Sequence, residues 1–228
     1  MNTEHILVLD IDGTLTDSVA LHQSAFLAAM LALKLPALDT NWGRYPHHTD
    51  TGILAHALSS NGRSPMSASA VAAFEQAVDR HFVAALARQA LMEIPGAGQF
   101  VREAIASGWG IVFATGGVRR VSERKLQAVG IPFDDDLLVT SSVYPSRTDL
   151  VAAAVERARR YYGVASSCRT VSIGDGLWDL EVAGALGLEF IGIGMPPKAD
   201  VLTTRGAVVF PDFDDVRLAR LLGIVTAG

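Results

Sequence analysis

Residues 5–16 read His-Ile-Leu-Val-Leu-Asp-Ile-Asp-Gly-Thr-Leu-Thr, and this stretch decides the fold that we expect. The apolar run is typical of a buried β-strand. It ends in two carboxylates, Asp10 and Asp12, and a glycine turn. Two acids at a strand tip in apolar surroundings are costly unless positive charge lies beside them. A magnesium ion, which prefers oxygen ligands, is the simplest such partner.

The second half of the chain alternates between apolar strands and helical segments. We expect helices near 98–107, 118–129, 147–162 and 177–186, then a C-terminal helix, with strands at 110–114, 137–139, 170–173, 190–193 and 207–210. This alternation predicts an α/β fold, a Rossmann-like parallel sheet core covered by helices on both faces. Ligands of such sheets bind beyond the carboxyl ends of the strands.

Residues 17–94 have a different character, with helical stretches at 21–31, near 50–60 and at 67–91 and no strand candidate. Ser67 is the expected N-cap of the last helix, and Pro95-Gly96-Ala97-Gly98 marks a boundary. We therefore predict a Rossmann-like catalytic core formed by residues 1–16 and 95–228. Residues 17–94 are predicted to form an inserted all-helical cap domain, with crossings near 15–18 and 92–97.

Composition narrows the classes of protein that fit. The chain has 228 residues, half of them apolar, and a formal net charge of −5, so one domain with an insertion is expected. No Lys/Arg-rich run suggests nucleic-acid binding. No run of about 18 apolar residues suggests a membrane span. The single Cys168 excludes an internal disulfide, and with no leader-like segment at the N-terminus it fits a cytoplasmic protein.

Two further motifs stand at the ends of predicted strands. Thr115 and Gly116 follow the strand at 110–114, where a hydroxyl and backbone N–H groups can face an anion. Asp175 and Asp179 follow the strand at 170–173 and lie four residues apart, on one face of a helix if one begins there. Helix-capping alone also explains an Asp at such a position.

In order and spacing, these motifs resemble those of the haloacid dehalogenase superfamily, whose first motif has the pattern DxDGT. The resemblance implies that Asp10 is the nucleophile that attacks phosphorus and that Asp12 is the acid/base. It implies that Thr115 binds phosphate, with Gly116 beside it. The implied cofactor is Mg²⁺, and the implied metal residues are Asp10, Asp12 (through its backbone carbonyl), Asp175 and Asp179.

The third motif of the superfamily usually supplies a lysine, and this chain departs from that pattern. The matching region reads Val143-Tyr144-Pro145-Ser146-Arg147-Thr148-Asp149-Leu150. Ser146 and Asp149 form an S-x-x-D capping box, which places Arg147 at the first helical position. A cation there opposes the helix dipole by roughly 0.3–1 kcal/mol, a cost that is offset if Arg147 faces Asp10 and a phosphate.

The resemblance makes Arg147 a catalytic residue, and a solvated arginine at a helix start is the alternative. Lys125 and Lys198 are the substitutes for this role, although Lys125 lies in the middle of a predicted helix and is expected to be solvated. Arginine is planar, permanently charged and bidentate. The departure therefore bears on rate and substrate more than on reaction class.

The resemblance implies a phosphatase branch with a helical cap, similar to phosphoglycolate phosphatase. The expected activity is magnesium-dependent hydrolysis of a small phosphate monoester through an aspartyl-phosphate intermediate. Asp12 argues against the dehalogenases, which lack this acid. A raised pKa, supplied by burial and a neighbouring carboxylate, is expected to keep Asp12 protonated when the cycle begins. The alternatives are a phosphomutase of the beta-phosphoglucomutase type and a non-catalytic phosphate-binding or regulatory protein on the same fold.

The loop at residues 42–50 is the most promising part of the cap for contact with substrate. Arg44 and His47, with His48, are the candidate substrate-binding residues there, and a surface loop with Thr49 as a helix cap is the alternative. The partner is expected to be a small phosphorylated metabolite such as phosphoglycolate, a sugar phosphate or a nucleotide. No nucleic-acid or membrane partner is expected, and the protein is expected to be a monomer or a homodimer.

Overall fold

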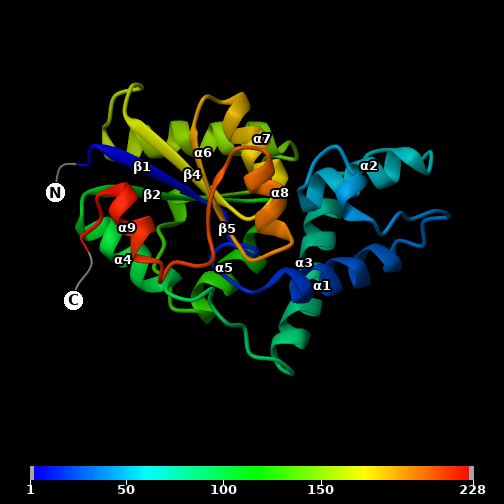
Figure 1. Cartoon of the computed structure of the whole chain (residues 1–228). Coiled ribbons are helices and arrows are strands. Elements are labelled where there is room, and N and C mark those ends of the chain that lie inside the picture. Colours follow the sequence, from blue (N-terminus) through cyan, green and yellow to red (C-terminus); the bar gives the residue numbers. More distant parts are fainter. Residues whose placement is uncertain (1–2, 226–228) are drawn as a thin grey trace.

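The computed structural model describes residues 3–225, which form a parallel six-stranded sheet with helices on both faces and a helical layer to one side (Figure 1). The strands are β1 (His5–Leu9), β2 (Trp109–Thr115), β3 (Leu138–Thr140), β4 (Arg169–Gly174), β5 (Glu189–Ile193) and β6 (Val208–Phe210). Their order in the sheet is β3-β2-β1-β4-β5-β6, and every neighbouring pair is parallel. This confirms the predicted α/β fold.

The helices of the core are α4 (Ala97–Ala106), α5 (Arg119–Ala128), α6 (Arg147–Tyr162), α7 (Leu177–Ala185), α8 (Lys198–Thr204) and α9 (Val216–Leu222). A 3₁₀ turn, η2 (Asp135–Leu137), precedes β3. Helix α8 was not predicted, because its seven residues begin without a side-chain cap and carry only one buried side chain. Among residues 3–225, no helix combines the length and the apolar character needed to span a membrane.

Strand β1 explains why helices cover both faces of the sheet. Its pleat sends Leu7 and Leu9 to one face, where they join an apolar cluster that includes residues of α4 and α9. Ile6 and Val8 point to the other face and join a cluster with residues of α6 and α7. All four side chains are at most 1% exposed, so β1 is buried on both faces, as in parallel sheets generally.

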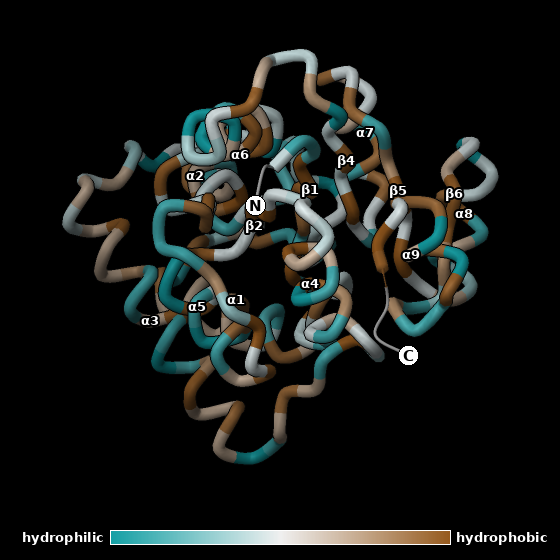
Figure 2. The backbone as a smooth tube through the Cα atoms, turned by 90° about the vertical axis from the view of Figure 1, so that its left-hand side faces the viewer, coloured by the Kyte–Doolittle hydropathy of each residue, from teal (hydrophilic) through white to brown (hydrophobic). Residues whose placement is uncertain are grey.

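The helical layer consists of α1 (Val19–Ala32), the 3₁₀ turn η1 (Trp42–Arg44), α2 (Asp50–Ser60) and α3 (Ala68–Leu86). These elements share an apolar cluster of their own, which Val118 and Val121 of the core also join. Figure 2 shows apolar and polar residues alternating along these helices, as expected where one side of a helix is buried. Ser67 caps α3 by accepting a hydrogen bond from the Ala70 N–H, as predicted, but α3 ends at Leu86 rather than near residue 91.

The two crossings between the sheet and the helical layer lie side by side. Thr16 and Glu93 form an isolated antiparallel bridge. The Asp17 N–H donates to the Met92 carbonyl at 2.9 Å, and the Ile94 N–H donates to the Leu15 carbonyl at 2.9 Å. This pairing explains the early end of α3, because the chain leaves the helix to return to the first crossing. The exact division into core and cap stays a prediction.

Candidate active site

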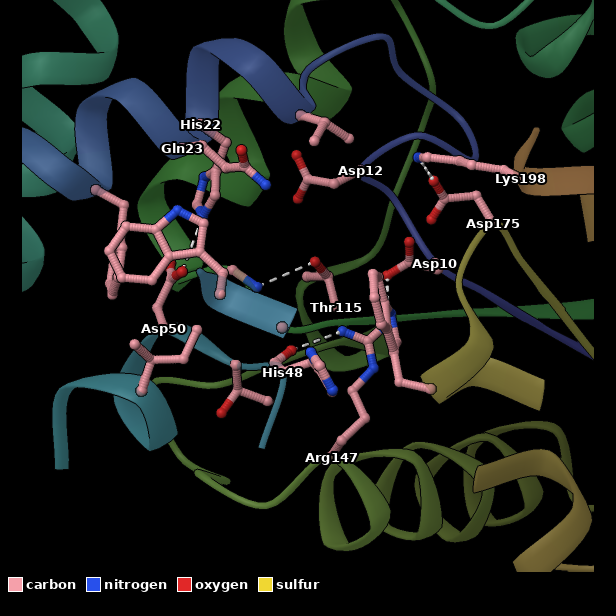
Figure 3. Close-up of a pocket in the computed structure, with 18 residues that line it drawn as sticks. Asp10, Asp12, His22, Gln23, His48, Asp50, Thr115, Arg147, Asp175 and Lys198 are labelled. Atoms are coloured by element: carbon pink, nitrogen blue, oxygen red, sulfur yellow. Dashed lines mark hydrogen bonds and ion pairs between the residues drawn. The ribbon is translucent and has the colours of Figure 1, made fainter. Parts of the chain in front are cut away.

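The candidate site lies where the strand order reverses. Strand β1 is followed along the chain by β2 and β3 on one side, whereas β4, β5 and β6 lie on the other. Ligands of open α/β sheets bind at such a switch point. Asp10 follows β1, and its N–H donates to Ile173 of β4 at 3.0 Å. Asp175 follows β4, so the topology brings the first and last predicted motifs together (Figure 3).

Asp10 is held by two donors on opposite oxygens of its carboxylate. Arg147 Nη2 donates to Oδ1 at 2.8 Å, and Thr14 Oγ1 donates to Oδ2 at 3.2 Å. Arg147 is the first residue of α6, and Ser146 caps that helix by accepting from the Asp149 N–H. The Ser146 helix cap sets the start of α6 and thereby positions the Arg147 side chain. The expected position of Arg147 beside Asp10 is therefore the observed one, and the solvated alternative is wrong.

The same guanidinium also joins Asp10 to Asp179. Arg147 Nη2 donates to Asp179 Oδ1 at 2.5 Å, while Asp179 Oδ2 accepts from the Gly176 N–H at 3.1 Å. Arg147 and both carboxylates are buried. Burial alone lowers the pKa of Arg147, but the charges of Asp179 and Asp10 outweigh it and raise that pKa. Arg147 is a permanent cation at this site.

Three buried carboxylates form a group suited to a metal ion. Asp10, Asp175 and Asp179 each place an oxygen within 4.8 Å of the others. Burial raises the pKa of Asp10 well above its usual range, and the neighbouring acids raise it further against the opposing effect of Arg147. Burial and the charge of Asp179 raise the pKa of Asp175 to about 6. Even with Arg147 beside them, these carboxylates raise one another's pKa, and a cation that prefers oxygen ligands fits them.

Lys198 and Thr115 complete this end of the site. Lys198, at the start of α8, donates to Asp175 at 2.5 Å, so it pairs with Asp175 rather than with Asp10. Thr115 ends β2 and is buried, and its hydroxyl oxygen accepts from the Gly117 N–H at 3.2 Å. Its own proton remains available to a ligand, as the phosphate-binding prediction requires.

Asp12 turns away from the acidic group and lies in a different network. Its Oδ2 accepts from Lys125 Nζ at 2.7 Å, and its Oδ1 accepts from the Ser18 hydroxyl. Burial alone would raise the pKa of Asp12, but Lys125, His22 and the two hydrogen bonds outweigh it and lower that pKa. The prediction of a raised pKa is wrong, because it placed Asp12 among carboxylates instead of cations.

Lys125 corrects a second prediction. It is 0% exposed, although its position in a polar helix predicts a solvated side chain. Besides Asp12, its ammonium contacts His22 Nδ1 at 3.0 Å. The opposite ring nitrogen, His22 Nε2, lies 2.9 Å from Asp50 Oδ1. Asp50 in turn accepts from the Val118 N–H at 3.0 Å. This chain of contacts joins the core to α1 and α2 of the helical layer.

Two glycines are required by how closely the backbone packs around the site. Gly13 has a φ of +79°, and a Cβ there would lie 2.2 Å from Asp175 Oδ2. A Cβ at Gly116 would lie 2.4 Å from the His48 carbonyl oxygen and 2.6 Å from Arg147 Nη1. A side chain at either position would therefore displace an acidic residue or the guanidinium.

The residues of the site line one cavity of about 140 Å³. Asp10, Asp12, Thr115, Gly116, Arg147 and Asp175 all line it. From the helical layer it receives Val19, His22, Gln23, Phe26, Trp42, His48, Thr49, Asp50 and Ile53. The cavity thus joins the carboxyl edge of the sheet to the cap, as a lidded active site requires.

The predicted substrate-binding residues of the 42–50 loop are only partly where we expected them. Arg44 is 74% exposed and pairs with Asp39 at 3.7 Å, and His47 is exposed; neither lines the cavity. His48 lines it instead, stacked on Trp178 with 4.5 Å between ring centroids. Adjacent residues of an extended segment point in opposite directions, and composition alone did not reveal which of them turns inward. Thr49 caps α2, as the alternative reading holds.

Sequence patterns missed His22, Asp50 and the buried state of Lys125. Each lies on a helix among ordinary helical neighbours, so no local spacing marks it. His22 and Lys125 are 103 residues apart, and Asp12 and Lys125 are 113 apart. A single sequence carries no signal for such contacts.

Comparisons with known proteins agree with this geometry. The family model for haloacid dehalogenase-like hydrolases matches residues 5–187. No curated protein matches the sequence. Among solved structures, CbbY from Rhodobacter sphaeroides in complex with phosphate is 21% identical with a TM-score of 0.69, covering 94% of this chain and 96% of that one.

Two further solved structures are similar over most of their length. A putative beta-phosphoglucomutase from Bacteroides vulgatus is 18% identical with a TM-score of 0.70, covering 96% of this chain and 88% of that one. A hydrolase from Pseudomonas syringae is 20% identical with a TM-score of 0.69, covering 97% and 100%. At these identities the structures show a shared fold.

Proposed function

This chain belongs to the haloacid dehalogenase-like hydrolase family, and on that basis we propose that it is a magnesium-dependent phosphatase acting through an aspartyl phosphate on Asp10. The substrate is a small phosphate monoester. The observation that carries the proposal is the 2.8 Å contact between Arg147 Nη2 and Asp10 Oδ1 beside a buried acidic group. A carboxylate nucleophile paired with a fixed cation suits attack on an anionic phosphate.

The first step forms a bond between Asp10 and phosphorus and breaks the bond to the leaving alcohol. Arg147 and the Thr115 hydroxyl hold the phosphoryl oxygens while Asp10 attacks in line. Bound at Asp10 and Asp175, with the Asp12 backbone carbonyl as a further ligand, magnesium would offset the negative charge of the phosphoryl oxygens. Asp179 holds Arg147 in place through its 2.5 Å contact.

Asp12 serves both steps in opposite protonation states. Its ion pair with Lys125 keeps it a carboxylate in the free protein. A phosphate dianion bound beside it favours its protonated form, which then gives the proton to the leaving oxygen. In the second step, water attacks the phosphorus of the aspartyl phosphate. Asp12 takes the proton of that water, and free phosphate leaves.

The experiment is a panel of phosphate monoesters assayed for release of inorganic phosphate, with magnesium and with EDTA. We expect activity with magnesium, its loss in EDTA, and a loss of at least about 10³-fold in Asp10→Asn, because the nucleophile is removed. Asp136→Asn, the same change at an exposed residue away from the cavity, is the matched control and is expected to be fully active.

Three results would contradict the proposal in different ways. Activity that survives Asp10→Asn removes the assigned nucleophile. Transfer of phosphate from glucose 1,6-bisphosphate to β-glucose 1-phosphate, in place of release, identifies a phosphomutase. A wild-type protein that binds phosphate but hydrolyses nothing in the panel identifies a non-catalytic binding protein.

A further inference from the structure

The part of the cavity that faces the cap indicates which kind of leaving group fits there. In-line attack sends the leaving oxygen away from Asp10, toward Asp12 and α1, where Figure 3 shows Gln23 beside His22. We call the cap residues on this side the leaving-group wall, and they are Val19, Gln23, Phe26, Trp42 and Ile53.

The leaving-group wall is apolar apart from the Gln23 amide and the indole N–H of Trp42. Phe26 and Trp42 pack edge to face with 5.4 Å between ring centroids, which gives the wall an aromatic surface suited to a flat or ring-shaped group. Gln23 is exposed toward the cavity, and its amide makes no hydrogen bond to any residue in the described range 3–225. It is the one side chain of the wall that can both donate a hydrogen bond to a polar group and accept one from it.

Every cation that lines the cavity already faces an acid. Arg147 is paired with Asp10 and Asp179, and Lys198 with Asp175. His22 contacts Asp50. Burial and the charge of Arg147 lower the pKa of His48 and so disfavour its charged form. Among the lining residues, all within 3–225, no lysine or arginine is left without an acid to face a second anionic group of the substrate.

The cap adds no further cation to the cavity. Its lysine and arginines are Lys34, Arg44, Arg63, Arg80 and Arg88, and none of them lines it. The carboxylates that line the cavity are Asp10, Asp12, Asp50 and Asp175, and the lysine and arginine that line it are Lys198 and Arg147. A dianionic phosphate bound beside Asp10 uses the charge of Arg147. A second anion near Asp50 would lie beside a carboxylate, with no unpaired lysine or arginine among the lining residues to offset it.

Resting on the proposed phosphatase activity, we infer that the enzyme selects monoesters whose leaving group is uncharged and presents a flat or ring-shaped apolar face to Phe26 and Trp42. Gln23 binds a polar atom of that group. Bisphosphates and phosphorylated carboxylic acids are poor substrates. The leaving-group wall with the Gln23 amide determines this specificity, while Asp10, Asp12 and Arg147 determine the reaction.

The test compares three esters that differ at one position of the ring: phenyl phosphate, 4-carbamoylphenyl phosphate and 4-carboxyphenyl phosphate. The carbamoyl and carboxyl groups have the same shape and differ in charge. We expect similar kcat/KM for the first two and a kcat/KM roughly tenfold or more lower for the carboxylate, because like charge opposes its binding.

A variant that introduces a positive charge sharpens the comparison. Gln23→Lys places a cation on the leaving-group wall, and we expect it to raise the ratio of kcat/KM for carboxyphenyl over carbamoylphenyl phosphate roughly tenfold. Gln76→Lys makes the same change at an exposed position of the cap that does not line the cavity, and the ratio should stay at its wild-type value.

The outcomes separate this inference from the proposed function. If the carboxylate ester is hydrolysed as well as the carbamoyl ester, the inference fails and the phosphatase stands. If bisphosphates or phosphorylated acids are hydrolysed but all three aryl esters are refused, the inference fails in the same way. If no ester of any kind is hydrolysed, the proposed function fails, and the inference falls with it.

Discussion

Lys125 shows how far surroundings decide the chemistry of one side chain. It lies on α5 among polar residues, yet it is fully buried against Asp12 and His22. Its ammonium lowers the pKa of Asp12 despite burial. A residue that looks like an ordinary surface lysine is therefore the main reason why the proposed acid/base is ionised in the free protein.

Removing this ammonium is expected to destabilise the fold. Lys125→Met leaves the Asp12 carboxylate without its cation, and we expect the free energy of unfolding to fall by about 3 kcal/mol, the lower end for a buried pair, because Asp12 is 20% exposed. Urea denaturation measures it. Arg120→Met, at an exposed position of the same helix, is expected to change stability by less than about 0.5 kcal/mol. Equal losses in the two variants would contradict the assigned role.

Arg147 is the residue where this chain departs from the lysine usual in the superfamily. One guanidinium nitrogen contacts both Asp10 and Asp179, and a second donates to the His48 carbonyl at 3.3 Å. Lysine has a single nitrogen and no fixed plane. The arginine therefore connects Asp10, Asp179 and the loop that carries His48, whereas a lysine reaches fewer of them.

Helix α6 illustrates how the start of an element positions a functional group. Its cap, Ser146, precedes Arg147 directly and accepts from the Asp149 N–H. The residue that stabilises the helix is thus adjacent to the one that contacts Asp10. Helix α3 offers a comparison, since Ser67 caps it in the same way at an exposed position.

Loss of the two caps is expected to cost similar stability and different activity. Ser146→Ala and Ser67→Ala should each lower the free energy of unfolding by about 1 kcal/mol. Only Ser146→Ala should lower kcat/KM, because the first turn of α6 holds Arg147. Thermal unfolding together with kinetics on an aryl phosphate measures both. Unchanged kcat/KM in Ser146→Ala would show that the position of Arg147 does not depend on its cap.

Across the molecule, the sheet brings together residues that are far apart in sequence. Asp10 and Asp175 meet because β1 and β4 are neighbours at the point where the strand order reverses. The helical layer then closes over them through two adjacent crossings at Thr16 and Glu93. The acidic group is therefore a property of the whole fold, where burial and the repulsion between its carboxylates raise the pKa of Asp10.

A metal ion that relieves this repulsion should stabilise the whole protein. At about 100 times its dissociation constant, magnesium is expected to add about 2.7 kcal/mol, which raises Tm by roughly 2–4 °C per kcal/mol for a chain of this size. Scanning calorimetry measures the shift without any substrate. Asp175→Asn should lose the shift and Asp136→Asn should keep it. A full shift in Asp175→Asn would place the metal elsewhere.

The sequence by itself determined the class of fold and the motif residues. Alternating apolar strands and helices predict the parallel sheet because each strand must bury both faces. Asp10, Thr115, Arg147 and Asp175 stand at element ends, which local patterns predict well. Those patterns act over a few residues, so the sequence carries them directly.

Tertiary structure alone decided how those residues work. Three features depend on contacts across a hundred residues or on small rotations of a loop. Asp12 contacts Lys125, which in turn contacts His22. His48 rather than Arg44 lines the cavity, and no lysine or arginine of residues 17–94 lines it. The physical reason is that charge and burial act through space, and distance along the chain sets neither.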